Sequence, residues 1–166
     1  MLRARWYLRS ATELGPKVRL WGTPVVSNDG TLRVGDRARL VSTIVPMEIA
    51  VAEGATLDIG EGAFINYGCS LGVTLEVRIG SGCSIGPYAI IMDNDFHRME
   101  PERRNEMPPS APIVLEENVW LGARVTVLRG VTIGAGSVIG AGSVVVKDIP
   151  PRSLAAGAPA RVLRSL

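Results

Sequence analysis

The feature that most limits the fold of this chain is a six-residue spacing of aliphatic residues. In the second half of the sequence the series runs Leu115, Leu121, Val127, Ile133, Ile139 and Val145. If about a quarter of residues were aliphatic by chance, a fixed frame would show such a run only roughly a few times in ten thousand. Upstream, the same spacing forms two series that are separated by two extra residues, Ile59, Ile65, Leu71 and then Ile79, Ile85, Ile91.

A period of six fits neither the 3.6 residues of a helical turn nor the two-residue alternation of an ordinary strand. It fits a three-sided coil. Three hexads would make one turn of about eighteen residues, with each aliphatic side chain inside a narrow prism and successive turns about 4.8 Å apart. Gly122, Gly134 and Gly140 directly follow an aliphatic residue, where a tight turn beside a neighbouring coil favours glycine. The pattern therefore predicts a parallel β-helix.

The length and composition indicate one domain, because 166 residues with 46% hydrophobic residues can build a single core. We expect residues 1–20 to cap the first coil through a short helix, since the open end of a solenoid must be covered. Residues 30–149 would form the β-helix, and residues 150–166 an irregular C-terminal tail. Residues 92–112 interrupt the hexads with prolines and charges. They are predicted to leave the prism as a long loop, a kind of segment that is usually functional in compact domains.

Charge and cysteine usage exclude several classes of protein. The net charge is only +2, so nucleic acid is not an expected partner. Residues 1–19 are locally basic, with five cationic side chains against Glu13 alone, and arginines interrupt every apolar stretch there. No signal peptide or membrane span is predicted, so we expect a cytoplasmic protein with at most peripheral membrane contact. Cys69 and Cys83 lack the spacing of a zinc site or a disulfide framework and are expected to be reduced, structural thiols.

His97 is the single histidine of the chain, and it lies in the predicted loop. Asp93 and Asp95 stand four and two residues before it, so either carboxylate is a candidate to accept a hydrogen bond from the ring and fix its tautomer. One histidine per chain cannot supply the two or three imidazole ligands of a catalytic zinc site, so no metal is expected. The simple alternative is a solvated surface histidine without a role.

The string GPYAIIMDNDFH, at residues 86–97, and the stretch from Asn118 to Arg164 resemble the hexapeptide-repeat acyltransferases, in particular the galactoside and maltose acetyltransferases. The resemblance covers roughly residues 30–166. It implies an all-β, left-handed parallel β-helix that transfers an acetyl group from acetyl-CoA to a hydroxyl of a sugar or glycan precursor, with a role in polysaccharide biosynthesis. It also implies that His97 is the general base, and that the enzyme is a homotrimer with its clefts between neighbouring chains.

The same resemblance assigns the coenzyme site to the second half of the chain. Trp120 would lie beside the thioester, and backbone groups around Ala123 and Ala141 would bind the pantetheine arm. The nucleotide end would be met by four further residues, Val146, Lys147, Arg161 and Arg164. The charges agree, because the pyrophosphate and 3′-phosphate of coenzyme A favour the forked donors of arginine. The alternative for these cations is a solvated basic tail.

The acceptor is less well defined. Asn66 matches the asparagine that meets the sugar in galactoside and maltose acetyltransferases, although a turn asparagine is the alternative. Thr74 stands where those enzymes place a sugar-binding aspartate, and their N-terminal acceptor-binding region is not recognisable in residues 1–30. Two other functions therefore stay open: acetylation of an antibiotic or other xenobiotic hydroxyl, and a non-catalytic β-helix scaffold. A scaffold would not need His97, Trp120 and the basic tail together.

Overall fold

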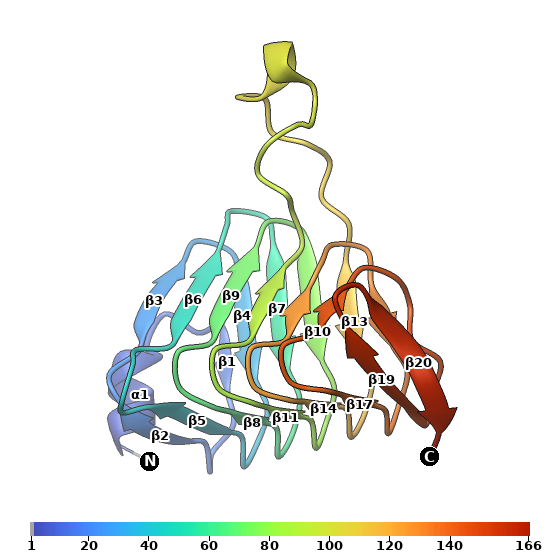
Figure 1. Cartoon of the computed structure of the whole chain (residues 1–166). Coiled ribbons are helices and arrows are strands. Elements are labelled where there is room, and N and C mark those ends of the chain that lie inside the picture. Colours follow the sequence, from blue (N-terminus) through green and yellow to red (C-terminus); the bar gives the residue numbers. More distant parts are fainter. Residues whose placement is uncertain (1) are drawn as a thin grey trace.

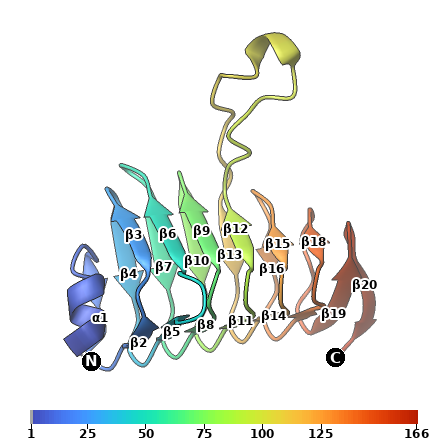
Figure 2. The same ribbon diagram turned by 60° about the vertical axis from the view of Figure 1, so that its left-hand side comes forward.

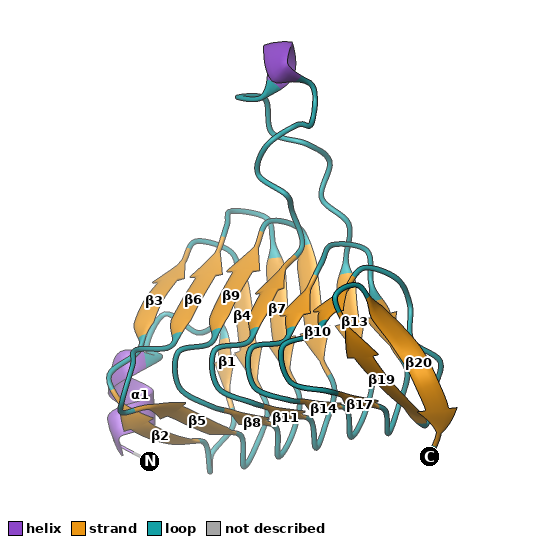
Figure 3. Cartoon of the chain, in the orientation of Figure 1, coloured by secondary structure: helices purple, strands orange, loops and turns teal. Residues whose placement is uncertain are grey.

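The computed structural model describes residues 2–166 as a three-sided, left-handed parallel β-helix from which one long loop stands out (Figure 1). Helix α1 (Leu2–Tyr7) covers the first coil. The rest of the chain consists of strands and loops, with a single 3₁₀ turn, η1 (Pro101–Arg103), at the tip of the long loop (Figure 3). None of the helices in residues 2–166 has the length and hydrophobicity needed to cross a membrane.

Each wall of the prism is one sheet. Sheet A contains β1 (Glu13–Leu14), β4 (Thr31–Val34), β7 (Thr56–Ile59), β10 (Glu76–Ile79), β13 (Ile113–Leu115) and β16 (Thr132–Ile133). Sheet B contains β2 (Arg19–Gly22), β5 (Arg39–Ser42), β8 (Phe64–Ile65), β11 (Ser84–Ile85), β14 (Trp120–Leu121), β17 (Val138–Ile139), β19 (Ser153–Gly157) and β20 (Ala160–Ser165). Sheet C contains β3 (Val25–Asn28), β6 (Glu48–Val51), β9 (Ser70–Val73), β12 (Ile90–Met92), β15 (Thr126–Val127) and β18 (Val144–Val145).

The hexad residues form vertical ladders inside the prism. In sheet C, one ladder has every member at most 1% exposed, and it runs Ile49, Leu71, Ile91, Val127, Val145. Burying each such side chain contributes roughly 1.5–3 kcal/mol, so the repeated aliphatic position is also the main source of stability. The turns are tight where glycine was expected: a Cβ on Gly122 would lie 2.6 Å from the backbone nitrogen of Ala141 on the next coil. The predicted parallel β-helix is confirmed.

The two extra residues in the hexad series widen one corner of the prism. Strand β9 ends at Val73 and β10 begins at Glu76, so Thr74 and Leu75 form the insertion. The buried carboxylate of Asp93, on the next coil, accepts hydrogen bonds from the backbone N–H groups of residues 74, 75 and 76, at 2.8, 2.7 and 2.7 Å. It thereby supplies the acceptor for these N–H groups at the corner where the chain of the next coil leaves the prism as the long loop.

The structure differs from the sequence-based expectation at both ends of the solenoid. The β-helix begins at Glu13 rather than at residue 30, because the weakly patterned residues 13–28 already form a coil of three short strands, one in each sheet. Residues 150–166 are not an irregular tail. Strand β19 continues sheet B in parallel with β17, and β20 folds back antiparallel upon it. This hairpin covers the last coil, as a solenoid end requires. Residue 1 of the predicted cap lies outside the described residues.

Candidate active site

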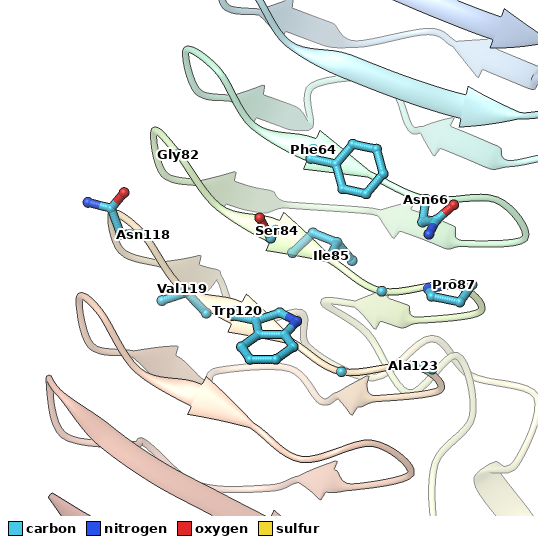
Figure 4. Close-up of a pocket in the computed structure, with 12 residues that line it drawn as sticks. Phe64, Asn66, Gly82, Ser84, Ile85, Pro87, Asn118, Val119, Trp120 and Ala123 are labelled. Atoms are coloured by element: carbon cyan, nitrogen blue, oxygen red, sulfur yellow. The ribbon is translucent and has the colours of Figure 1, made fainter. Parts of the chain in front are cut away.

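The outward-facing side chains of sheet B line a groove of about 600 Å³. Phe64, Ser84 and Trp120 are register partners on three successive coils, so they form the floor of this groove (Figure 4). Asn66 and Ala123 also line it. A groove of this size suits a small-molecule ligand, and it brings together three residues that the sequence singled out, Asn66, Trp120 and Ala123.

Trp120 and Asn66 offer different chemistry to a ligand in the groove. The indole of Trp120 is 55% exposed, which is a large apolar surface to leave in water without a partner. The side-chain oxygen of Asn66 accepts a hydrogen bond from the backbone N–H of Tyr67 at 2.9 Å. Asn66 is therefore a turn asparagine, as the alternative reading expected, but its amide NH₂ keeps two donors for a ligand.

Ala123 and Ala141 occupy the same corner on neighbouring coils, where sheet B turns into sheet C. The N–H of Gly142 donates to the carbonyl oxygen of Ala123 at 2.8 Å, which fixes the spacing of the two turns. This corner forms a regular edge of backbone groups about 4.8 Å apart. It leads from the groove toward the C-terminal end of the prism.

Arg161 and Arg164 lie on β20, at the C-terminal end of sheet B. Both are exposed. Their guanidinium groups contact only backbone carbonyl oxygens, of Ala160 at 2.9 Å and of Ser165 at 3.2 Å. Within residues 2–166 neither has a carboxylate at ion-pair distance, so both are available for an anionic ligand.

Val146 and Lys147 are not at the groove. They follow β18 at the corner where sheet C turns into sheet A, and both are exposed. The long loop leaves the prism at this same corner, between β12 and β13. Figures 1 and 2 show that the loop rises from the edge opposite sheet B. The predicted site residues therefore form two groups on different edges of the prism.

His97 is exposed in the long loop, beside a hollow of about 210 Å³ that Asp95, Pro108 and Arg129 also line. Its Nδ1 atom lies 2.9 Å from the backbone carbonyl oxygen of Arg104, across the two legs of the loop. The ring is thus oriented by a backbone group seven residues further on. A backbone acceptor has no signature in the sequence, so the sequence could not reveal this partner.

Neither aspartate orients His97, which corrects the prediction that Asp93 or Asp95 would do so. Both oxygens of Asp93 are occupied by residues 74–76, as described above. Asp95 forms an ion pair with Arg129 on the next coil, with Nε and Oδ2 2.5 Å apart. The two carboxylates instead fix the base of the loop to the prism.

Asn94 fastens the two legs of the loop to each other. Its side chain is 3% exposed, and its NH₂ group donates to the carbonyl oxygen of Pro108 at 2.9 Å and to the hydroxyl of Ser110 at 2.7 Å. All three residues of the segment 93–95 therefore hold the base of the loop in place. His97 lies two residues after this segment, and its ring is held by the carbonyl oxygen of Arg104, next to the 3₁₀ turn at the loop tip.

Cys69 and Cys83 are free and buried, as expected. Burial raises the pKa of each thiol to about 11. The thiolate, which is the nucleophilic form, is therefore strongly disfavoured at neutral pH. Neither cysteine is placed to carry an acyl group.

Comparisons with known proteins agree with the fold. Residues 112–147 match the family described as bacterial transferase hexapeptide (six repeats). Nodulation protein L of Rhizobium meliloti is 36% identical over 158 residues, which are 95% of this chain and 82% of that protein. Galactoside O-acetyltransferase of Escherichia coli is 39% identical over 113 residues, which are 68% of this chain and 56% of that enzyme.

A solved structure shows the same architecture with the donor bound. The hexapeptide-repeat acetyltransferase of Vibrio cholerae in complex with acetyl coenzyme A superposes with a TM-score of 0.64 at 31% identity, covering 94% of this chain and 69% of that one. Since the similarity to nodulation protein L extends over most of both chains, it does not rest on the repeat alone. The chain therefore belongs to the hexapeptide-repeat acetyltransferase family, and within it resembles the sugar O-acetyltransferases.

Proposed function

We propose that this protein transfers an acetyl group from acetyl-CoA to a hydroxyl of a sugar or glycan precursor, with His97 as the general base. The observation that carries the proposal is the contact between Nδ1 of His97 and the carbonyl oxygen of Arg104 at 2.9 Å. A carbonyl oxygen can only accept a hydrogen bond, so Nδ1 carries the proton in the neutral ring. The lone pair of Nε2 is then free to take a proton from an acceptor hydroxyl.

The reaction needs no covalent enzyme intermediate. As Nε2 of His97 removes its proton, the hydroxyl oxygen attacks the thioester carbonyl carbon. The tetrahedral intermediate then collapses with cleavage of the C–S bond, and the proton passes from the imidazolium to the departing thiolate. The products are the acetyl ester and free coenzyme A. The buried thiols of Cys69 and Cys83, with pKa values of about 11, support direct transfer over an acyl-enzyme.

The coenzyme would extend along sheet B from the groove to the C-terminal hairpin. Trp120 would lie by the thioester, and the backbone edge at Ala123 and Ala141 would bind the pantetheine arm. Trp120 and Arg164 are linked by a ladder of register partners through Val138 and Leu154, a span of about 14 Å at the strand spacing. The free guanidinium groups of Arg161 and Arg164 would then meet the phosphates.

A homotrimer would complete the site. Since the long loop that carries His97 leaves the edge opposite sheet B, it rises away from the groove of its own chain (Figure 1). Packing three copies around a threefold axis would place the loop edge of one chain against sheet B of the next. Val146 and Lys147, on the loop edge, would then join the coenzyme site of the neighbouring chain. Because its donor is a cytoplasmic metabolite, we propose that the enzyme acts in the cytoplasm.

The test is to measure release of coenzyme A with a panel of neutral and anionic sugar acceptors, and to repeat it with His97→Ala. We expect turnover to fall by roughly 10² to 10⁴, the usual contribution of a positioned general base, while coenzyme A still binds. Met99→Ala, which alters an exposed side chain of the same loop, serves as the matched control. Near-full activity of His97→Ala at saturating substrates would remove the assignment.

A further inference from the structure

A cluster of cationic side chains lies at the N-terminal end of sheet B, on the same face as the groove. Lys17, Arg19, Arg37 and Arg39, together with Gly62, line a recess of about 410 Å³. The four cations come from two successive coils, since Arg19 and Arg39 are register partners in β2 and β5. The recess is separate from every residue assigned above to the coenzyme.

Three of these four cations have no acidic partner. Arg37 pairs with Glu61 at 2.8 Å and with Asp36 at 3.6 Å. By contrast, no carboxylate within residues 2–166 lies at ion-pair distance from the side chains of Lys17, Arg19 or Arg39. Arg19 and Arg39 stand on adjacent strands about 4.8 Å apart, an arrangement in which like charges destabilise the sheet. A bound anion would reverse that repulsion.

The same coils neutralise their arginines on another wall. Arg33, on sheet A, lies between Glu13 and Asp58 at 3.1 Å from each. On sheet A, an arginine is therefore paired with acidic register partners on the neighbouring strands. Within residues 2–166, Arg19 and Arg39 on sheet B lack such partners, which leaves a local excess of positive charge beside the groove.

The recess adjoins the groove. The guanidinium carbon of Arg39 lies 5.1 Å from the ring centroid of Phe64, and Phe64 is part of the groove floor. From Trp120 the ladder of register partners runs through Ser84 and Phe64 to Arg39. At the strand spacing, Arg39 is about 10 Å from Ser84 and about 14 Å from Trp120.

Sheet B thus carries cations at both ends of a neutral middle. Arg161 and Arg164 lie at the C-terminal end of sheet B, toward which the donor would extend, and the phosphates of the donor would bind them. The donor has no second anionic end to account for the other cluster. An anion bound at the N-terminal end of the groove would therefore belong to the other substrate.

We propose that the recess of Lys17, Arg19 and Arg39 binds an anionic group of the acceptor, about 10–15 Å from the hydroxyl that is acetylated. This rests on the proposed function and names its acceptor class: a sugar that carries a phosphate or a carboxylate at that distance, as in a nucleoside diphosphate sugar or an acidic oligosaccharide. Arg19 and Arg39 present forked donors suited to either group, and Lys17 adds a third charge.

The test uses the intact protein saturated with coenzyme A, so that the donor's own phosphate site is filled. Inorganic pyrophosphate and digalacturonate are titrated separately by calorimetry, which distinguishes a phosphate from a carboxylate site. We expect one of these probes to bind at least tenfold more tightly to the wild type than to the double variant Arg19→Gln/Arg39→Gln. Arg33→Gln, which removes an exposed arginine from the same region but from sheet A, should bind the probe like the wild type.

Equal binding of both probes to the wild type and the double variant, or no binding to the wild type, would overturn the proposal. Lys17→Gln provides a second variant if the double variant does not fold. In the acceptor panel, an acceptor with the preferred anionic group should have a KM at least tenfold lower than its neutral counterpart, and the double variant should lose this difference at unchanged KM for acetyl-CoA. Failure of the proposed function is recognised separately, as absence of coenzyme A binding when coenzyme A is added to saturate the protein before the probes are titrated.

Discussion

Asp93 and Thr74 are joined by two hydrogen bonds to one carboxylate oxygen, from the backbone N–H and from the hydroxyl of Thr74, each 2.8 Å long. The other oxygen accepts the N–H groups of Leu75 and Glu76. The carboxylate is thus saturated with donors at the corner from which the loop bearing His97 departs. An acidic residue that looked catalytic in sequence holds together the corner between β9 and β10.

Removing this anchor should destabilise the fold. Asp93→Ala would leave three N–H groups without an acceptor at a side chain that is 0% exposed, and we expect a loss of about 3 kcal/mol or more in the free energy of unfolding. Asp95→Ala, which breaks only the half-exposed pair with Arg129, should cost about 1 kcal/mol or less. Urea denaturation of the two variants measures the difference. Equal, small effects would show that Asp93 does not support the corner.

The arginines of the C-terminal hairpin should act on donor binding rather than on chemistry. Arg161→Gln and Arg164→Gln should each raise the KM for acetyl-CoA by about tenfold with little change in kcat, since contacts to phosphates far from the thioester are similar in the ground and transition states. Arg33→Gln serves as a surface control. Inhibition by dephospho-coenzyme A tests the contact further. If the variants discriminate between it and coenzyme A as sharply as the wild type does, these arginines do not bind the 3′-phosphate.

The two thiols should be protected in the folded protein. Burial raises their pKa from 9.0 to about 11, so at pH 8 the thiolate fraction is about a hundredfold lower than in the unfolded chain. Alkylation by iodoacetamide should be slower by at least that factor in the native state than in urea. Because the folded-state pKa is raised, the thiols favour the fold below pH 9, and this contribution is lost as the pH rises toward 11. Rapid native-state alkylation at pH 8 would contradict the burial.

The cross-subunit site predicts rescue between two inactive variants. His97→Ala chains and Trp120→Ala chains, unfolded together and refolded, should form mixed trimers in which some clefts combine an intact His97 with an intact Trp120. We expect a fraction of wild-type activity to return, measured against each parent refolded alone. A fully active monomer on sedimentation, or mixed trimers without activity above the parents, would exclude a site shared between chains.

Much of the fold follows from the spacing of a few residue types. Inward positions such as Ile85 and Leu121 could be read from the period of six, because a three-sided coil with six residues per side returns every sixth residue to the interior. The long loop was evident from its prolines and charges. The first coil at residues 13–28 was missed because its inward positions are less regularly aliphatic, and the terminal hairpin was missed because it does not follow the repeat.

The sequence by itself determined the parallel β-helix and the position of the loop, because side-chain type at a fixed spacing specifies which residues are buried. The candidate residues His97, Trp120 and Asn66 came from the resemblance of their surrounding segments to the acyltransferase family. Only the tertiary structure decided how these residues are placed. In the folded protein, Asp93 and Asp95 hold the base of the loop, and the ring of His97 contacts a backbone carbonyl oxygen. The loop that carries His97 leaves the edge opposite the groove. Such relationships depend on which coil, wall and corner each residue occupies, and that placement arises only when the coils stack.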